Sequence, residues 1–389
     1  MAANQAACCP RRNREVKIMP SPQNFWEDLF AVQAGEAGSF RVEMQMVAKH
    51  GRSFLLLPCQ RRAAVVCLGL YPAQTPRARA ARTILSWMLK AAAPFATKHI
   101  TFTVPSDNPF AGFLSSQAGQ PKGGLPTLGV LAGNPATDGQ RFLLLVFDAR
   151  QMPVAVVKAG LSERARSLIE KEESFLAAVP PNTSGVPRLR AVFQCPRLRA
   201  LALDFFAGHS PRPRDKGALP ALLASWVDPQ RTIALDQAPD WVRLKSAAAA
   251  NELFGLLAGR LRGRTFRAAI HHGDFAPWNV KVSSSGAWTV LDWERGEPAG
   301  IPGWDWFHYV IQPAILVERL PAPDLVQRVE VLLTSEAFKS YADRAGIIGC
   351  ERELVLAYLL HAAEVIKPSE GLAPTCDLLR ALAARWRQA

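Results

Sequence analysis

Long apolar segments are scarce in this sequence of 389 residues. No uncharged apolar run reaches the roughly 18–20 residues that a membrane-spanning helix needs. The chain also does not open with a basic segment followed by an apolar one, which is the pattern of a secretory leader. We therefore expect a cytoplasmic protein without a membrane span.

C-x-x-C motifs and glycine-rich phosphate-binding motifs are missing as well. The seven cysteines are odd in number and none forms a C-x-x-C pair, which argues against a disulfide framework and against a zinc cluster. No Walker A sequence occurs, which argues against a P-loop NTPase. Between Leu125 and Arg141 the glycines are scattered without a G-x-G-x-x-G pattern, and 133–135 is the predicted turn. No backbone contact to a phosphate can be named there.

The composition is that of an ordinary globular protein, with 49% hydrophobic and 20% charged residues. The net charge of +13 suits acidic partners such as a nucleotide, a phosphorylated substrate, nucleic acid or an anionic membrane. An Arg-rich solvated surface explains the same charge. No block of Lys and Arg interleaved with aromatic residues stands out, so we do not expect nucleic acid as a partner. The sequence carries no prediction of the oligomeric state.

The first third of the chain divides into a loose segment at 1–35, with one short helix at 25–32, and an α/β extension at 36–120. The extension holds β-like runs at 40–46 and 63–70 with 54–57 between them, a helix at 76–92 and a Pro-, Gly- and Ser-rich linker at 105–126. Whether the extension is an independent domain or an elaboration of the lobe that follows it stays open.

The pattern changes at about residue 121. Residues 121–206 read as strands at 125–131, 141–147 and 154–158, with a loop at 133–139 between the first two, then a helix at 163–179 and strands at 189–193 and 200–206. Residues 207–389 are largely helical, with predicted helices at 218–226, 241–261, 323–345, 351–366 and 375–387. We expect an α+β protein with a small antiparallel β lobe that carries one helix, and a larger helical lobe.

One loop carries residues suited to phosphoryl transfer. The tripeptide His-Gly-Asp at 272–274 is followed five residues later by Asn279, and an apolar strand at 288–291 leads to Asp292. Transfer to a hydroxyl needs a carboxylate that orients the nucleophile and accepts its proton, and oxygen ligands for Mg²⁺. Asp274 is the candidate base, and Asn279 and Asp292 are the candidate metal ligands.

These residues resemble the aminoglycoside phosphotransferase and choline kinase family. That family commonly shows HGD-x4-N and then I-D-[WF]-[ED], and here 272–280 reads HGDFAPWNV and 290–294 reads VLDWE. The resemblance covers about 125–345 and implies a bilobal protein-kinase-like fold, an ATP-type donor and a hydroxyl acceptor. The segment GWDWF at 303–307 is similar to the family's D-x-A-[YW]-D-L segment. It implies that Asp305 supports the loop that begins at His272.

A kinase-like site also needs a cation on the donor phosphates, held by a helix carboxylate. Lys158 ends a β-rich run at the expected place. In the family the paired Glu typically precedes a Leu by four residues, which selects Glu172. Glu173 is the alternative, and we expect Glu170 to be solvated.

The strand at 200–206 should lead into the crossing between the lobes. We expect backbone contacts to adenine near Asp204, Phe205 and Phe206, although a strand end and turn alone explain the same residues. Glu294 either reaches the metal through water or caps the loop. His271 is expected to pack beside the loop rather than bind a ligand.

Three functions are compatible with the sequence. The first is a Mg²⁺-dependent small-molecule kinase that transfers the terminal phosphoryl group of ATP or GTP to a hydroxyl of a sugar, an amino alcohol or an aminoglycoside. The +13 charge and the absence of a dense acidic cluster at 306–389 weaken the case for an aminoglycoside, so that a neutral or anionic acceptor, such as a sugar, a polyol or a surface-polysaccharide precursor, is at least as well supported. The second is a kinase-like module that holds a nucleotide without transferring phosphate. The third is protein or nucleic-acid interaction through residues 1–120.

Overall fold

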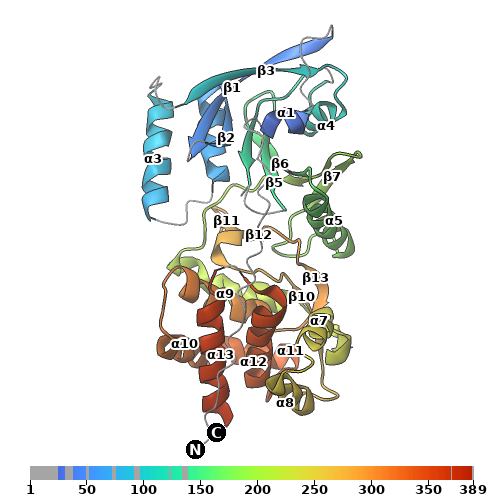
Figure 1. Cartoon of the computed structure of the whole chain (residues 1–389), viewed down its shortest axis with the longest axis vertical. Helices are drawn as coiled ribbons and strands as arrows, with labels where there is room; N and C mark the ends of the chain where they lie inside the picture. Colours follow the sequence, from blue (N-terminus) through green and yellow to red (C-terminus); the bar gives the residue numbers. More distant parts are fainter. Residues whose placement is uncertain are drawn as a thin grey trace, which may run out of the picture.

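The chain folds into two lobes stacked along its long axis, an upper lobe built on a β-sheet and a lower, mainly helical lobe (Figure 1). The computed structural model describes residues 25–30, 38–49, 52–71, 76–91, 97–121, 124–133, 139–368 and 370–387. Within these residues the fold is α+β and bilobal, which confirms the predicted fold class. No described helix is long and apolar enough to cross a membrane.

The upper lobe contains one antiparallel sheet in the order β3-β1-β2-β4-β5-β6-β8-β7. Its strands are β1 (Ser39–Lys49), β2 (Arg52–Pro58), β3 (Lys98–Pro105), β4 (Leu128–Ala132), β5 (Arg141–Phe147), β6 (Pro153–Gly160), β7 (Leu189–Gln194) and β8 (Arg199–Asp204). The strands of the extension continue the sheet of the predicted small lobe, since Leu55 of β2 pairs with Leu131 of β4. The extension is therefore attached to that lobe through strand pairing.

Both faces of this sheet are covered at its centre, which explains why central strands such as β2, β4 and β5 hold runs of consecutive apolar residues. Leu56 of β2 packs in the cluster formed by α1 (Phe25–Phe30) and α4 (Pro109–Gln117). Its neighbours Leu55 and Leu57 pack in the opposite cluster, with α2 (Arg61–Cys67) and α3 (Pro76–Lys90). Successive side chains of a strand point to opposite faces, so three consecutive leucines fill both cores.

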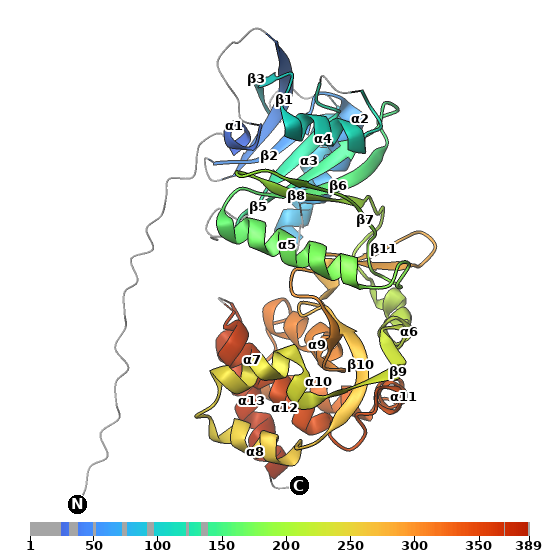
Figure 2. The same cartoon turned by 90° about the vertical axis from the view of Figure 1, so that its right-hand side faces the viewer.

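Helix α5 (Glu163–Ala178) lies below the sheet, toward the large lobe (Figure 2). The hydroxyl of Ser162 caps it by accepting a hydrogen bond from the N–H of Ala165. Its buried positions include Ile169, Glu172 and Phe175, which recur at helical spacing along one face. A glutamate therefore stands within the apolar stripe of this helix.

The large lobe surrounds a single extensive apolar core. Its sheet joins β13 (Glu297–Gly300), β10 (Thr265–His271) and β9 (Val227–Ala234), while β11 (Val280–Val282) and β12 (Trp288–Val290) form a separate hairpin near the boundary with the upper lobe (Figure 1). The helices are α6 (Leu219–Ser225), α7 (Pro239–Ala247), α8 (Glu252–Arg260), α9 (Trp304–Leu316), α10 (Ala322–Thr334), α11 (Glu336–Ala345), α12 (Glu351–His361) and α13 (Leu372–Arg387).

Two predictions for the extension are wrong. The β-like run at 63–70 is helix α2 followed by a short 3-10 turn, because its small and apolar residues cover one face of the sheet. The predicted linker at 105–126 contains helix α4. Asn108 caps this helix by accepting hydrogen bonds from the N–H groups of Phe110 and Ala111, with proline at the first helical position.

Two predicted helices of the large lobe are each divided in two. The helix predicted at 241–261 is broken into α7 and α8 at Asn251, which caps α8 with its side chain. The helix predicted at 323–345 is broken into α10 and α11 at Ser335, whose hydroxyl accepts from the N–H of Phe338. Local side-chain caps of this kind compete with continuation of a helix. The predicted turn at 133–135 lies mostly outside the described residues, as does the start of the segment at 1–35.

Candidate active site

The loop between β10 and β11 is anchored by the first turn of α9. The carboxylate of Asp305 accepts hydrogen bonds from the backbone N–H of His272 at 2.7 Å and of Gly273 at 3.1 Å. Gly273 has a φ of +76°, and a Cβ added to it would lie 2.9 Å from the carbonyl oxygen of Arg295. Glycine is therefore required here by both conformation and space.

His272 links this loop to the segment that follows β12. Its Nδ1 accepts from the N–H of Asp274 at 3.2 Å, so its Nε2 carries the proton and donates to the carbonyl of Leu291 at 2.7 Å. Burial lowers the pKa of His272 despite nearby carboxylates, which keeps the ring neutral. Because Leu291 precedes Asp292, this imidazole fixes the distance between the loop that carries Asp274 and the segment that carries Asp292.

Asp274 is held at both of its carboxylate oxygens. The amide of Asn279 donates to Oδ2 at 3.1 Å and to the backbone carbonyl of Asp274 at 2.9 Å. Nε2 of His308, on α9, lies 3.2 Å from Oδ1. Burial would raise the pKa of Asp274, but His308, Arg295 and His272 together hold it below its ordinary value. Asp274 is therefore a carboxylate at neutral pH, as a proton acceptor must be.

Sequence reasoning missed His308. It stands one helical turn after Asp305, so the spacing of the two residues on a predicted helix was an available signal. What the spacing alone could not give is the direction of that helix face relative to the loop.

Lys158 of β6 forms the centre of an ion cluster between the lobes. Its Nζ lies 2.6 and 2.8 Å from the two carboxylate oxygens of Glu172 and 2.5 Å from Oδ1 of Asp292. Glu172 is fully buried, and burial raises its pKa while Lys158 opposes that rise. The alternatives lie elsewhere, since Glu173 and Glu170 both pair with Arg199.

Three carboxylates in this region can share a cation. Ligand oxygens of Glu172, Asp292 and Glu294 all lie within 4.8 Å of one another. Burial would raise the pKa of Asp292, but Lys158 outweighs it and the pKa falls to about 2. Asp292 also has a left-handed backbone, with a φ of +68°, an uncommon conformation that clusters at functional sites. An all-oxygen set of this kind fits Mg²⁺.

Glu294 is already partnered across the lobes. The guanidinium of Arg141, the first residue of β5, binds both of its carboxylate oxygens, with one contact of 2.9 Å. Two roles were predicted for Glu294, a contact with the metal through water and a cap on the loop. Its position beside Glu172 and Asp292 is compatible with the contact through water. The amide nitrogen of Asn279 faces Asp274, so its oxygen is the atom left to bind a metal.

The predicted adenine-binding residues lie where β8 ends. Asp204 pairs with Arg188 at 3.3 Å, and the N–H of Phe205 donates to the carbonyl of Val154, which extends the sheet by one bond. The backbone N–H of Phe205 is thus committed to the sheet. A contact from this backbone N–H to adenine is not available, and the prediction stays with Phe206 and the carbonyl groups.

His271 is part of a buried ion network under the loop, rather than simply packed. Its Nδ1 lies 2.8 Å from the carboxylate of Asp240 on α7, and its Nε2 lies 3.4 Å from Asp305. Burial would lower the pKa of His271, but the two aspartates raise it to about 9. A buried imidazolium therefore stands directly behind the predicted catalytic loop.

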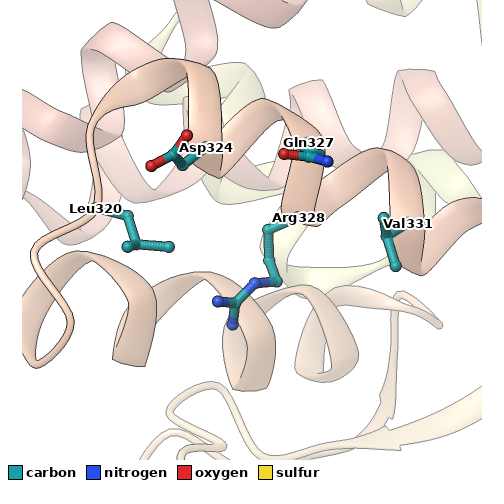
Figure 3. Close-up of a pocket in the computed structure, with 5 residues that line it drawn as sticks. All are labelled: Leu320, Asp324, Gln327, Arg328 and Val331. Atoms are coloured by element: carbon teal, nitrogen blue, oxygen red, sulfur yellow. The ribbon is translucent and has the colours of Figure 1, made fainter.

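A surface pocket on the large lobe is not part of this site. It has a volume of about 290 Å³ and lies along α10 (Figure 3). Arg328 in this pocket is paired with Glu318 at 2.9 Å. None of the residues of the loop or of the ion cluster lines it; the lining residues are Leu320, Asp324, Gln327, Arg328 and Val331.

No protein-family model and no curated protein matches this sequence. Solved structures do match. A putative fructosamine-3-kinase from Haemophilus somnus 129PT is 15% identical, with a TM-score of 0.40, over 70% of this chain and 96% of that one. A putative aminoglycoside phosphotransferase from Ralstonia eutropha JMP134 is 14% identical, with a TM-score of 0.43, over 71% and 97%. A choline kinase from Cryptosporidium parvum Iowa II is 11% identical, with a TM-score of 0.38, over 67% and 89%.

These proteins are kinase-like phosphotransferases, the group that the loop motif resembles. The low identities and TM-scores limit the likeness to a similar arrangement of the fold. The chemistry must therefore be argued from the side chains of this chain.

Proposed function

We propose that this protein is a kinase that transfers the terminal phosphoryl group of ATP or GTP to a hydroxyl of a small acceptor, with Mg²⁺. The observation that carries the proposal is the junction of Lys158, Glu172 and Asp292 at 2.5–2.8 Å. It joins the two lobes beside a loop that presents the ionised carboxylate of Asp274. Cation, helix carboxylate, metal-binding carboxylate and base are the parts that phosphoryl transfer requires.

Each residue has a role that follows from its charge and contacts. Lys158, held by Glu172, neutralises the donor phosphates. Asp274 accepts a hydrogen bond from the acceptor hydroxyl, orients it for in-line attack and takes its proton. Asn279 and Asp292 would hold Mg²⁺, with Glu294 beside them. The ion, when bound, neutralises charge on the transferring phosphates.

The surroundings of Asp274 also bear on the acceptor. Among the groups that hold the pKa of Asp274 below its ordinary value, the guanidinium of Arg295 carries a permanent positive charge. A cationic acceptor would meet repulsion from this guanidinium, whereas a neutral or anionic one would not. A sugar, a polyol or an acidic metabolite is therefore favoured over an aminoglycoside or choline.

The test compares wild type with Asp274→Ala and Asp292→Ala, with nucleotide consumption measured across a panel of hydroxyl metabolites. We expect Mg²⁺-dependent consumption with some acceptors by wild type and a loss of roughly 100-fold or more in each variant. Thermal stabilisation by nucleotide should persist in Asp274→Ala. Stabilisation of wild type without consumption for any acceptor would favour a nucleotide-holding module instead.

A further inference from the structure

Helix α9 presents three polar residues on one face toward the predicted catalytic loop. Asp305, His308 and Gln312 occupy positions i, i+3 and i+7, which lie above one another on a helix. The side chains of Asp305 and Gln312 are buried, and that of His308 is 13% exposed. Three polar groups on the buried face of an otherwise apolar helix need hydrogen-bond partners, because burial removes their hydrogen bonds to water.

Asp305 and His308 have partners on the loop itself. Asp305 binds the backbone at the loop's start, and His308 approaches the side chain of Asp274. The same helix thus contacts both the backbone and the carboxylate that the proposed reaction depends on.

A second residue fixes the ring of His308. The hydroxyl of Tyr358, on α12, lies 3.1 Å from Nδ1 of His308. Burial raises the pKa of Tyr358, so its O–H stays protonated and can donate to Nδ1. That leaves the proton of the neutral ring on Nε2, the nitrogen that faces Asp274.

Asp274 is the carboxylate that faces this nitrogen. Nε2 of His308 is buried, lies 3.2 Å from Oδ1 of Asp274, and has no aligned hydrogen-bond partner among the described residues. A buried donor without a partner is destabilising, because it has lost its hydrogen bonds to water. An imidazole so placed gains from approaching the carboxylate and from any adjustment that aligns the two groups.

We propose that His308 is a positioning residue for Asp274, with its ring oriented by the hydroxyl of Tyr358. The inference rests on the proposed kinase function. Asn279 donates to Oδ2, and Nε2 of His308 lies 3.2 Å from Oδ1, so the carboxylate has a polar neighbour on each of two sides. Removal of His308 lets the carboxylate rotate about its side-chain bonds, and the acceptor hydroxyl loses its alignment for attack.

The test uses three variants and one matched control. His308→Leu removes the donor, whereas His308→Gln keeps an N–H at a similar distance from the helix. Tyr358→Phe releases the ring of His308. His99→Leu is the control, because His99 lies on β3 in the extension, remote in sequence and structure from the site.

We expect His308→Leu to lower kcat roughly 10- to 100-fold, since small misplacements of a reacting group have effects of this size. The KM for the acceptor, the Kd for nucleotide and Tm should stay close to those of wild type. His308→Gln should recover most of kcat, and Tyr358→Phe should lie between them. His99→Leu should match wild type.

Several results would overturn the inference. If His308→Leu raises only KM, His308 binds the acceptor instead of positioning the base. If His308→Gln folds with wild-type Tm but stays as slow as His308→Leu, an N–H at this point is not what matters. If Asp274→Ala is inactive and His308→Leu is as fast as wild type, the inference about His308 is wrong while the proposed function stands. If wild type transfers no phosphate, the proposed function fails and the inference with it.

Discussion

At the scale of single residues, the site depends on charged side chains that are buried in the folded protein. Lys158 and Glu172 are 4% and 0% exposed, and each is the other's partner. Burying two charges is costly, and the loss of one partner leaves the other unpaired in a low-dielectric environment. Replacement of either residue alone is therefore destabilising, whether or not the intact ion pair adds net stability.

The first residue-scale prediction concerns this pair. Lys158→Met should destabilise the protein by about 3–5 kcal/mol, because Glu172 then lacks its cation or must take up a proton. The double variant Lys158→Met with Glu172→Leu should recover part of that loss. Urea unfolding of the three proteins gives the comparison. Equal stability of wild type and Lys158→Met would contradict the geometry of the pair.

At the scale of elements, the predicted catalytic loop rests on strands and helices joined by a buried ion network. His271 of β10 contacts Asp240 of α7 and Asp305 of α9, and Asp240 in turn pairs with Arg243 and lies 3.3 Å from His361 of α12. The two aspartates keep His271 protonated at neutral pH. The network makes the support of the loop sensitive to pH.

The second prediction follows from the sign of that shift. The pKa of His271 rises from 6.5 to about 9 on folding, so the protonated ring stabilises the fold fully below pH 6.5. That contribution declines as pH rises and is lost above about 9. The free energy of unfolding of wild type should exceed that of His271→Gln by the order of 3 kcal/mol at low pH, and the difference should shrink toward high pH. A difference in unfolding free energy between wild type and His271→Gln that does not change with pH would contradict this prediction.

The third prediction tests how closely β13 approaches β10. A Cβ added to Gly300 would lie 2.3 Å from the Cβ of His271, so Gly300→Ala forces the strands apart. We expect a loss of about 1–3 kcal/mol. Gly255 in α8 is the matched control, because nothing lies within 4 Å of an added Cβ there. Gly255→Ala should stabilise the helix by roughly 0.5–1 kcal/mol, and a loss at both glycines would contradict the packing argument.

Much of the fold was accessible from sequence because its signals are local. The strand at 141–147 follows from a short apolar run next to a polar turn, and the helix at 163–179 follows from helical spacing with a Ser162 cap; β5 and α5 match them closely. The run at 63–70 failed because a short apolar segment does not distinguish a strand from a covering helix. The Asn108-Pro109 cap was a legible signal, but the Pro- and Gly-rich surroundings obscured it.

The candidate site was accessible to the extent that its residues lie in short motifs. Asp274 and Asn279 are five residues apart, and the contact between them follows from that spacing. His308 was not found because its role depends on Tyr358, which is fifty residues further along the chain. The ion network of His271 likewise depends on Asp240, a contact that only the tertiary fold creates.

At the scale of the whole molecule, ion pairs connect the two lobes at the proposed nucleotide site. Lys158 reaches Asp292 and Arg141 reaches Glu294, each from the upper sheet to the segment after β12. A nucleotide bound between these groups would stabilise the folded state by mass action. The extension enlarges the upper sheet on the side away from these contacts, at β1 to β3.

The most direct test of the central claim is detection of the phosphorylated acceptor itself. Wild type should be incubated with ATP or GTP, Mg²⁺ and pools of hydroxyl metabolites, and phosphorus NMR should be used to follow new phosphate monoesters. The account predicts a monoester with wild type, and none with Asp274→Asn although nucleotide still raises its Tm. A monoester formed equally by Asp274→Asn, or nucleotide binding by wild type with no monoester from any pool, would contradict the account.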